Sequence, residues 1–179
     1  MARLLAGLLA LFTFGATQAA EPPKRYDGSY FKRQLYVVSD IDRALTLWRD
    51  VIGLEPGEIT TSGENSYSRE VFNVPQGVRM RFVTLSAGPQ QVRTLALLEV
   101  PKDLVPPKSG VRMTAAVVDA RGRLDEIAGK AKEMGLTVFS RRDLPSQTQG
   151  LGVEQGFLDW DGNVIVLYQF PVAASPSAR

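Results

Sequence analysis

The side chains that most often carry chemistry in proteins are unevenly represented in this sequence. It contains no histidine and no cysteine. The chain therefore lacks the usual proton-transfer group near neutral pH and the thiolate nucleophile, and it can form no disulfide. Candidate groups must therefore be sought among the remaining charged and polar side chains.

Two local clusters of such groups stand out. Asp159 and Asp161 flank a tryptophan just before a glycine. Such a pair could bind a cation or act as acid and base, but acids around an Asp-Gly turn more often accept hydrogen bonds from the turn's own backbone. The run Arg141-Arg142-Asp143 could form a lid or a contact for an anion, and the alternative is a solvated loop. We expect structural roles in both places.

The stretch of residues 33–54 gives the clearest structural signal in the chain, a strand followed directly by a helix. Residues 33–38 are rich in β-branched and aromatic side chains and predict a strand. The residues after them carry apolar side chains at helical spacing, with Ser39 as the predicted helix cap. Gly53 stands where a helix needs a residue of positive φ to end it.

Three further strands are predicted in this first unit. They cover residues 66–74, 79–87 and 93–100 and are separated by Pro/Gly turns. The first module, residues 33–100, therefore has the order β-α-β-β-β. A linker rich in proline follows at residues 101–110.

The same pattern then begins again, offset by roughly eighty residues. A helix over 121–134, ended by Gly135, follows a strand in the second module, which covers residues 111–170. An Asp-Gly dipeptide predicts a tight turn in its last hairpin. The elements predicted in this module are a strand at 112–118, the helix, a short strand at 136–140, a loop at 141–150 and a hairpin of 152–159 with 164–170.

The two ends of the chain are expected to lie outside these modules. Residues 1–20 join Arg3, a short apolar run and the small residues Ala19 and Ala20, a pattern typical of a cleaved signal peptide. The alternative is an uncleaved anchor, but the apolar run is short for a bilayer span. Residues 21–32 form a polar lead-in and residues 171–179 a disordered tail. We expect a periplasmic or secreted protein with no stable membrane anchor after cleavage.

Composition limits the class of partner. With 179 residues, 44% of them hydrophobic, the chain suits one domain or two small fused modules. Its net charge is +2, and no Lys/Arg run with interleaved aromatic residues occurs. A nucleic-acid partner is therefore not expected.

Two motifs carry a resemblance to a known superfamily. The stretches VSDIDRALTLWRDVIGL and GFLDWDGNVIVLYQF resemble the first and last motifs of the vicinal oxygen chelate superfamily, which contains glyoxalases, bleomycin-resistance proteins and extradiol dioxygenases. Ile52-Gly53-Leu54 matches the end of the first motif, and the second departs from the usual pattern by having Trp160 in place of proline. The resemblance covers residues 31–170.

This resemblance implies a fold and a site. The fold is α+β, with two paired βαβββ modules curled into an open, incomplete barrel. Relatives hold a divalent metal in the hollow through His, Gln or Glu side chains, which suit such ions. Relatives are also commonly dimers, so a homodimer is expected.

The superfamily's four metal-ligand positions fall on Arg33, Glu99, Met113 and Val166. Of these only Glu99 could bind a metal, because a guanidinium repels cations and the other two offer no donor that a hard cation prefers. A shift of one residue would bring Gln34 to the first position and Arg112 or Thr114 to the third. The resemblance thus implies a hollow without the usual metal site and without a cofactor.

Three functions remain open. The favoured one is a metal-free binder of a small molecule. Its candidate ligand contacts are Arg33, Glu99, Met113, Val166 and Tyr168. Tyr168 is included because it shares side-chain parity with Val166, although a core or rim tyrosine is the alternative. A metal-dependent lyase or dioxygenase with an atypical site is the second, and a structural or interaction protein with a filled hollow is the third.

The sharpest expectation concerns Arg33 and Glu99. Both positions point at one ion in relatives, so we expect their side chains to form an ion pair that replaces the metal. The alternative is a different register, with Arg33 on the surface.

Overall fold

The computed structural model describes residues 32–105, 114–147 and 149–171. All of them belong to one compact unit, residues 32–179. The predicted signal peptide, nearly all of the lead-in and the tail, half of the linker and Met113 lie outside the described residues. Expectations about those segments stay predictions.

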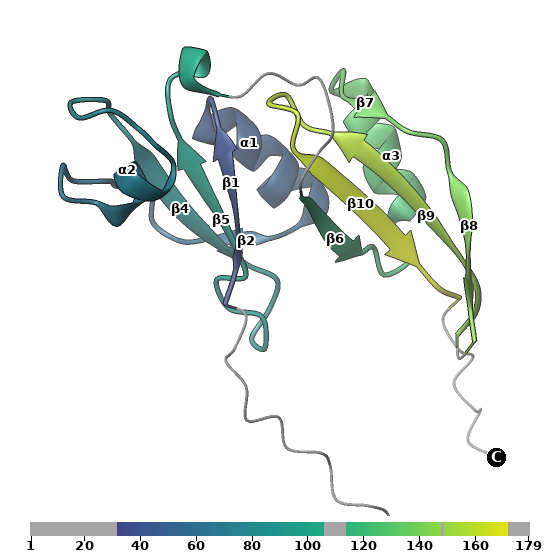
Figure 1. The fold of residues 1–179 in the computed structure, drawn as a ribbon. Helices are drawn as coiled ribbons and strands as arrows, with labels where there is room; N and C mark the ends of the chain where they lie inside the picture. The colour runs from purple at the N-terminus through teal and green to yellow at the C-terminus, as the bar shows by residue number, and fades with distance from the viewer. Residues whose placement is uncertain (1–31, 106–113, 148, 172–179) are drawn as a thin grey trace, which may run out of the picture. The chain divides into compact units, whose positions relative to one another are not determined.

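The first half of the described chain forms a mixed five-stranded sheet (Figure 1). β1 pairs in parallel with β5, while the other pairings are antiparallel. Its strands are β1 (Gln34–Val38), β2 (Glu55–Pro56), β3 (Thr60–Thr61), β4 (Arg81–Ser86) and β5 (Leu95–Glu99), in the order β1-β5-β4-β2, with β3 also paired to β4.

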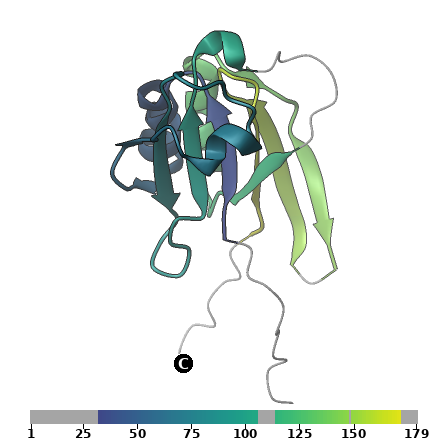
Figure 2. The same cartoon turned by 60° about the vertical axis from the view of Figure 1, so that its left-hand side comes forward.

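The second half repeats this topology. β6 pairs in parallel with β10, and β10, β7 and β8 pair antiparallel with β9. Figure 2 shows β8 running beside the long β9–β10 hairpin. The strands are β6 (Ala115–Asp119), β7 (Thr137–Val138), β8 (Arg142–Ser146), β9 (Gly150–Leu158) and β10 (Val164–Gln169).

Each half carries one amphipathic helix after its first strand. α1 (Ile41–Leu47) begins after Asp40, whose carboxylate accepts a hydrogen bond from the Arg43 backbone, and it continues as the π-helix η1 (Trp48–Ile52). Gly53 then adopts φ 92°, as predicted. The cap is Asp40 and not Ser39, whose hydroxyl donates to Asp161 and accepts from the Arg43 guanidinium. α3 (Leu124–Glu133) is the matching helix of the second half.

A single apolar core joins the two halves. Its largest member, Trp48, is 1% exposed, and it stacks at a tilt against Tyr36 with ring centroids 6.1 Å apart. Trp48 is therefore a packing residue of the core. The cluster draws side chains from α1, η1, α3 and both sheets, including Leu45, Leu97, Ile127, Phe157 and Ile165.

Two predicted elements were wrong. Residues 66–74, predicted as a strand, contain the short helix α2 (Tyr67–Val71). The buried Arg69 guanidinium donates to the Pro75 carbonyl at 2.9 Å and to Glu64, and these hydrogen bonds stabilise a compact turn in place of an extended chain. In place of the predicted strand at 66–74, the short strands β2 and β3 pair with β4. Residues 141–150, predicted as a loop, contain β8, whose polar side chains gave no hydrophobic alternation to detect.

The linker is described only in part. Residues 101–105 hold one turn of 3₁₀ helix, η2 (Lys102–Leu104). Among the helices that the structure describes, none combines the length and hydrophobicity needed to cross a bilayer.

Candidate functional site

The first sheet has two unlike faces, since side chains alternate along each strand. Tyr36, Val38, Val83 and Leu97 point to α1 and enter the main core. The alternate residues point the other way, and we call the face they form the open face. It carries Leu35, Val37, Phe82, Thr84, Ser86, Ala96 and Leu98.

One part of the open face is covered. Leu98 is fully buried there with Val74, Met80 and Val100, and Phe72, Val78 and Val105 pack around them. Residues 72–80, which follow α2, supply the part of this second cluster that lies over the strands. We call residues 64–80 the cover segment.

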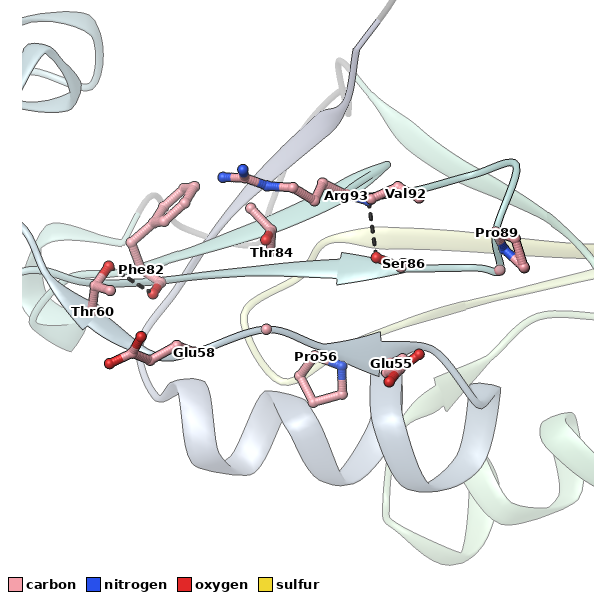
Figure 3. A pocket seen from close by; sticks show the side chains of 12 residues that line it. Glu55, Pro56, Glu58, Thr60, Phe82, Thr84, Ser86, Pro89, Val92 and Arg93 are labelled. Atoms are coloured by element: carbon pink, nitrogen blue, oxygen red, sulfur yellow. Dashed lines mark hydrogen bonds between the residues drawn. The ribbon is translucent and has the colours of Figure 1, made fainter.

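The β4 part of the open face lines a pocket of about 660 Å³. Its floor is formed by alternate residues of β4, Phe82, Thr84 and Ser86 (Figure 3). One wall is the β2–β3 segment and the other is the β4–β5 loop. These walls contribute Glu55, Pro56, Gly57, Glu58 and Thr60 on one side and Gly88, Pro89, Val92 and Arg93 on the other.

Backbone contacts hold both walls in place. The Gly57 N–H donates to the Thr84 carbonyl at 2.8 Å, and a side chain on Gly57 would lie 3.5 Å from the Thr84 hydroxyl oxygen. On the other side, the Arg93 N–H donates to the Ser86 hydroxyl at 3.0 Å. Arg93 has φ 56°, a left-handed conformation that non-glycine residues rarely adopt.

Charge is divided between the two walls. Figure 3 shows the Arg93 side chain running past Thr84 toward Phe82, while Glu58 extends from the opposite wall. Among the described residues, no ion pair involves Arg93, Glu55 or Glu58. The pocket therefore combines an aromatic ring, hydroxyl groups and separated charges of both signs, which suits it to bind a small polar molecule.

Solved structures with this topology are known. A glyoxalase family protein from Bacillus cereus is 13% identical, with a TM-score of 0.57 over 82% of this chain and 99% of that one. A trypanothione-dependent glyoxalase I from Leishmania major is 13% identical, with a TM-score of 0.55 over 79% and 87%. A glyoxylase/bleomycin resistance protein/dioxygenase domain from Frankia is 14% identical, with a TM-score of 0.53 over 79% and 98%.

The chain has the vicinal oxygen chelate fold. This confirms the α+β assignment with two βαβββ modules, and the two sheets are not closed into a barrel. In sequence, no family model matches the chain and no curated protein matches it significantly. Similarity at this level of identity establishes the fold alone.

The metal implied by this fold does not fit the residues present. Val166 is apolar and Arg33 is cationic, and Met113 lies outside the described residues. Within the described part of the chain, no three Asp or Glu side chains gather closely enough to hold an ion. A donor set of this kind offers a divalent cation no cage.

Glu99 does not enter the hollow at all. It has the parity of Leu95 and Leu97, so it points to the α1 side of the sheet. Its carboxylate accepts from the Ile41 backbone at 2.7 Å and from Arg81 through Nε at 2.7 Å and through a second short contact from Nη2. The hydrogen bond to Glu99 also raises the pKa of Arg81.

The expected Arg33–Glu99 pair is therefore wrong. Arg33 directly precedes β1, whose first residue is aligned with Leu95, whereas Glu99 is aligned with Val38. Five residues of strand separate the two positions, or about 16 Å. The guanidinium that pairs with Glu99 comes from Arg81, the neighbour of Glu99 across the β4–β5 pairing.

The other candidates lie on the second sheet. Ile165 and Leu167 are buried toward α3, so Val166 and Tyr168 point to the opposite face, as their parity predicts. Both are half-buried, and Tyr168 packs edge-on against Phe170 at 6.1 Å. Neither lines the pocket, and their role as ligand contacts stays a prediction.

The acidic turn has the structural role expected for Asp159. This carboxylate accepts from the backbones of Asp161 and Asn163 at 2.9 and 2.8 Å, and burial raises its pKa despite hydrogen bonds from Asn163 that oppose the shift. Asp161 instead crosses to the first module, where it accepts from the Ser39 N–H at 2.9 Å.

The residues that line the pocket were missed from the sequence. Their floor was detectable, because the predicted strand 79–87 alternates and puts Phe82, Thr84 and Ser86 on one face. The walls were not, since they depend on β2 and β3, which are too short to give a periodic signal.

Proposed function

We propose that this protein binds a small polar molecule in the pocket on the open face of the first sheet, without using a metal. The observation that carries the proposal is the pocket itself: about 660 Å³, walled on two sides and lined by hydroxyls, charges and one aromatic ring. That volume falls within the range of pockets that bind drug-sized ligands.

The alternatives have less support. A lyase or dioxygenase of the glyoxalase type would need ligands that Arg33 and Val166 cannot supply. A purely structural role would need a filled hollow, and the cover segment fills only part of the open face. Fold similarity does not by itself choose among these functions.

The binding site can be tested by blocking it. Thr60 and Thr61 are adjacent exposed residues of β3, and only Thr60 lines the pocket. A library of small polar metabolites should shift amide NMR signals of Phe82, Thr84 and Ser86 in the native protein. The Thr60→Trp variant should lose those shifts, whereas the Thr61→Trp variant should keep them. Binding that survives in both variants would place the site elsewhere.

We further propose that the protein acts outside the cytoplasm as a homodimer. The support for export is the charged, apolar and small-residue pattern of residues 1–20. Cell fractionation should find a shortened chain in the periplasm or medium, and a full-length precursor in the cytosol would contradict export.

Light scattering should give twice the chain mass, and the mass of a single chain at high concentration would contradict the dimer.

A further inference from the structure

Three charged side chains of the pocket stand on facing walls. Arg93 belongs to the β4–β5 loop, and Glu55 and Glu58 belong to the segment that begins at β2. All three are exposed, and none takes part in an ion pair among the described residues. Opposite charges share this pocket without neutralising each other.

The position of Arg93 is maintained at a cost in backbone energy. A left-handed φ of 56° is unfavourable for a residue with a Cβ, and strain of this kind tends to persist at functional sites. The hydrogen bond from the Arg93 N–H to the Ser86 hydroxyl supports the conformation. As a result the side chain runs along the pocket floor, past Thr84 toward Phe82 (Figure 3).

The chemistry of the two walls defines what would bind between them. A guanidinium fork binds a carboxylate through two parallel hydrogen bonds. Carboxylates on the other wall attract an ammonium group. Since Arg93 forms no ion pair with either glutamate among the described residues, the opposite charges are separated, and a ligand that binds both must span the gap. Phe82 provides apolar surface beside that gap, and Pro56 and Val92 add apolar surface elsewhere in the pocket (Figure 3).

We infer that the pocket selects zwitterionic ligands whose carboxylate and amine are separated by an apolar spacer, with Arg93 binding the carboxylate and Glu58 binding the amine. This inference rests on the proposed function and names its ligand class.

Matched probes separate the two charges. 6-Aminohexanoate carries both groups, hexanoate only the acid and hexylamine only the amine. Titrations of the protein at low salt, followed by amide NMR shifts at Thr84 and Ser86, should show 6-aminohexanoate binding about tenfold more tightly than either singly charged probe. 4-Aminobutanoate, with a shorter spacer, should bind more weakly than 6-aminohexanoate.

Charge-neutral variants assign each end. Arg93→Asn keeps a residue that tolerates positive φ and should weaken hexanoate about tenfold while leaving hexylamine unchanged. Glu58→Gln should do the reverse. Arg79→Asn and Glu70→Gln remove the same charges from exposed positions outside the pocket lining and should change neither affinity by more than about twofold at moderate salt.

The results distinguish this inference from the function beneath it. If 6-aminohexanoate binds no better than hexanoate or hexylamine, or if Arg93→Asn leaves hexanoate affinity unchanged, the zwitterion inference is wrong. If neutral library members still bind in the pocket and Thr60→Trp abolishes their binding, the proposed function stands without it. If no probe and no library member perturbs the pocket, both are wrong.

Discussion

Glu99 lies at the point where β5, β4 and α1 meet. Its carboxylate accepts hydrogen bonds from the first backbone N–H of α1 and from two nitrogens of Arg81, which also donates to Asp42 at 2.9 Å. The side chains of Arg81 and Glu99 are only 22% and 18% exposed. A carboxylate at a helix N-terminus is also favoured by the helix dipole. The residue that the superfamily's metal position suggested thus anchors a helix to a sheet.

The first prediction concerns this anchor. Glu99→Ala should lower the free energy of unfolding by about 2–4 kcal/mol, because it leaves a helix N–H without its partner and removes two of the three hydrogen bonds of the half-buried Arg81 guanidinium. Chemical denaturation of Arg81→Ala, Glu99→Ala and the double variant should give a coupling energy of about 1–2 kcal/mol. The cycle of Arg33→Ala with Glu99→Ala is the control and should be additive within about 0.5 kcal/mol. Coupling between Arg33 and Glu99, with none between Arg81 and Glu99, would instead support the Arg33–Glu99 ion pair.

A second prediction concerns the pH dependence of Asp159. Burial raises its pKa in the folded state, so the folded protein holds this proton more tightly than the unfolded chain does. The stabilising effect is present below the ordinary pKa of an aspartate and is lost as pH rises through the raised value. As pH rises above about 4, the unfolding free energy of the native protein should therefore fall relative to that of the Asp159→Asn variant.

Glu126 provides the control of opposite sign. Hydrogen bonds from Arg123 and Lys130 lower its pKa to about 2. Its contribution is therefore present above the ordinary pKa of a glutamate and is lost as pH falls toward that lowered value. The difference between the native protein and Glu126→Gln should be small, because this carboxylate is fully exposed, and should shrink on acidification. A difference for Asp159→Asn that grows on acidification would contradict the assignment.

At the scale of elements, the main helix of each module is ended by a glycine with positive φ. η1 ends at Gly53, whose φ of 92° follows a turn in which the Leu54 N–H donates to the Trp48 carbonyl at 2.9 Å. The second helix ends in the same way at Gly135, with φ 75°. These two glycines set the direction in which each chain leaves its helix toward the next strand.

The third prediction tests this at Gly53. Gly53→Ala should destabilise the fold by about 1–2 kcal/mol, because alanine is strained at positive φ. Gly129→Ala is the matched control: Gly129 lies inside α3, and a Cβ there would have no neighbour within 4 Å. That change should stabilise the fold by about 0.5–1 kcal/mol. Thermal melts of both variants measure the difference, and equal signs would argue against the left-handed conformation at Gly53.

The cover segment shows how one side chain can shape an element. Arg69 is 4% exposed and donates to the Pro75 carbonyl and to Glu64, which also accepts from the Gly77 N–H at 3.2 Å. These contacts close the segment on itself, and its apolar residues then cover the open face. A buried arginine thus stabilises the segment that covers part of the open face.

At the scale of the whole molecule, polar contacts join the two modules beside their shared core. Asp161 accepts from the Ser39 N–H, the Asn163 amide donates to the Val37 carbonyl at 3.2 Å, and the Tyr36 hydroxyl donates to the Val164 carbonyl at 2.9 Å. All lie between the end of β1 and the β9–β10 turn. The last motif of the sequence is thus held against the first.

The fourth prediction tests the junction. Asp161→Ala should lower the free energy of unfolding by about 2–3 kcal/mol, because the Asp161 side chain is only 7% exposed and its loss removes bonds to a charged acceptor. Asp143→Ala removes a carboxylate from an exposed position of β8 and should change it by less than about 0.5 kcal/mol. Denaturant titration measures both, and a comparable small loss in the two variants would show that the shared core alone joins the modules.

The sequence by itself determined the repeated βαβββ order, the helix-ending glycines and the strands that alternate strongly, such as β4 and β10. Those features are local: a run of alternating or helically spaced apolar residues carries its own signal. The structural role of Asp159 was equally local, because its partners lie within four residues of it.

Only the tertiary structure decided the site. Side-chain period in a strand is two, so an error of one residue moves a carboxylate from the hollow to the helix side, as happened for Glu99. The partner of Glu99 depended on the register of β4 against β5, and α2 depended on a buried guanidinium that finds its acceptors only once the chain has folded. The pocket arises where two very short strands and a loop meet the floor of β4, and no single segment of sequence contains that arrangement.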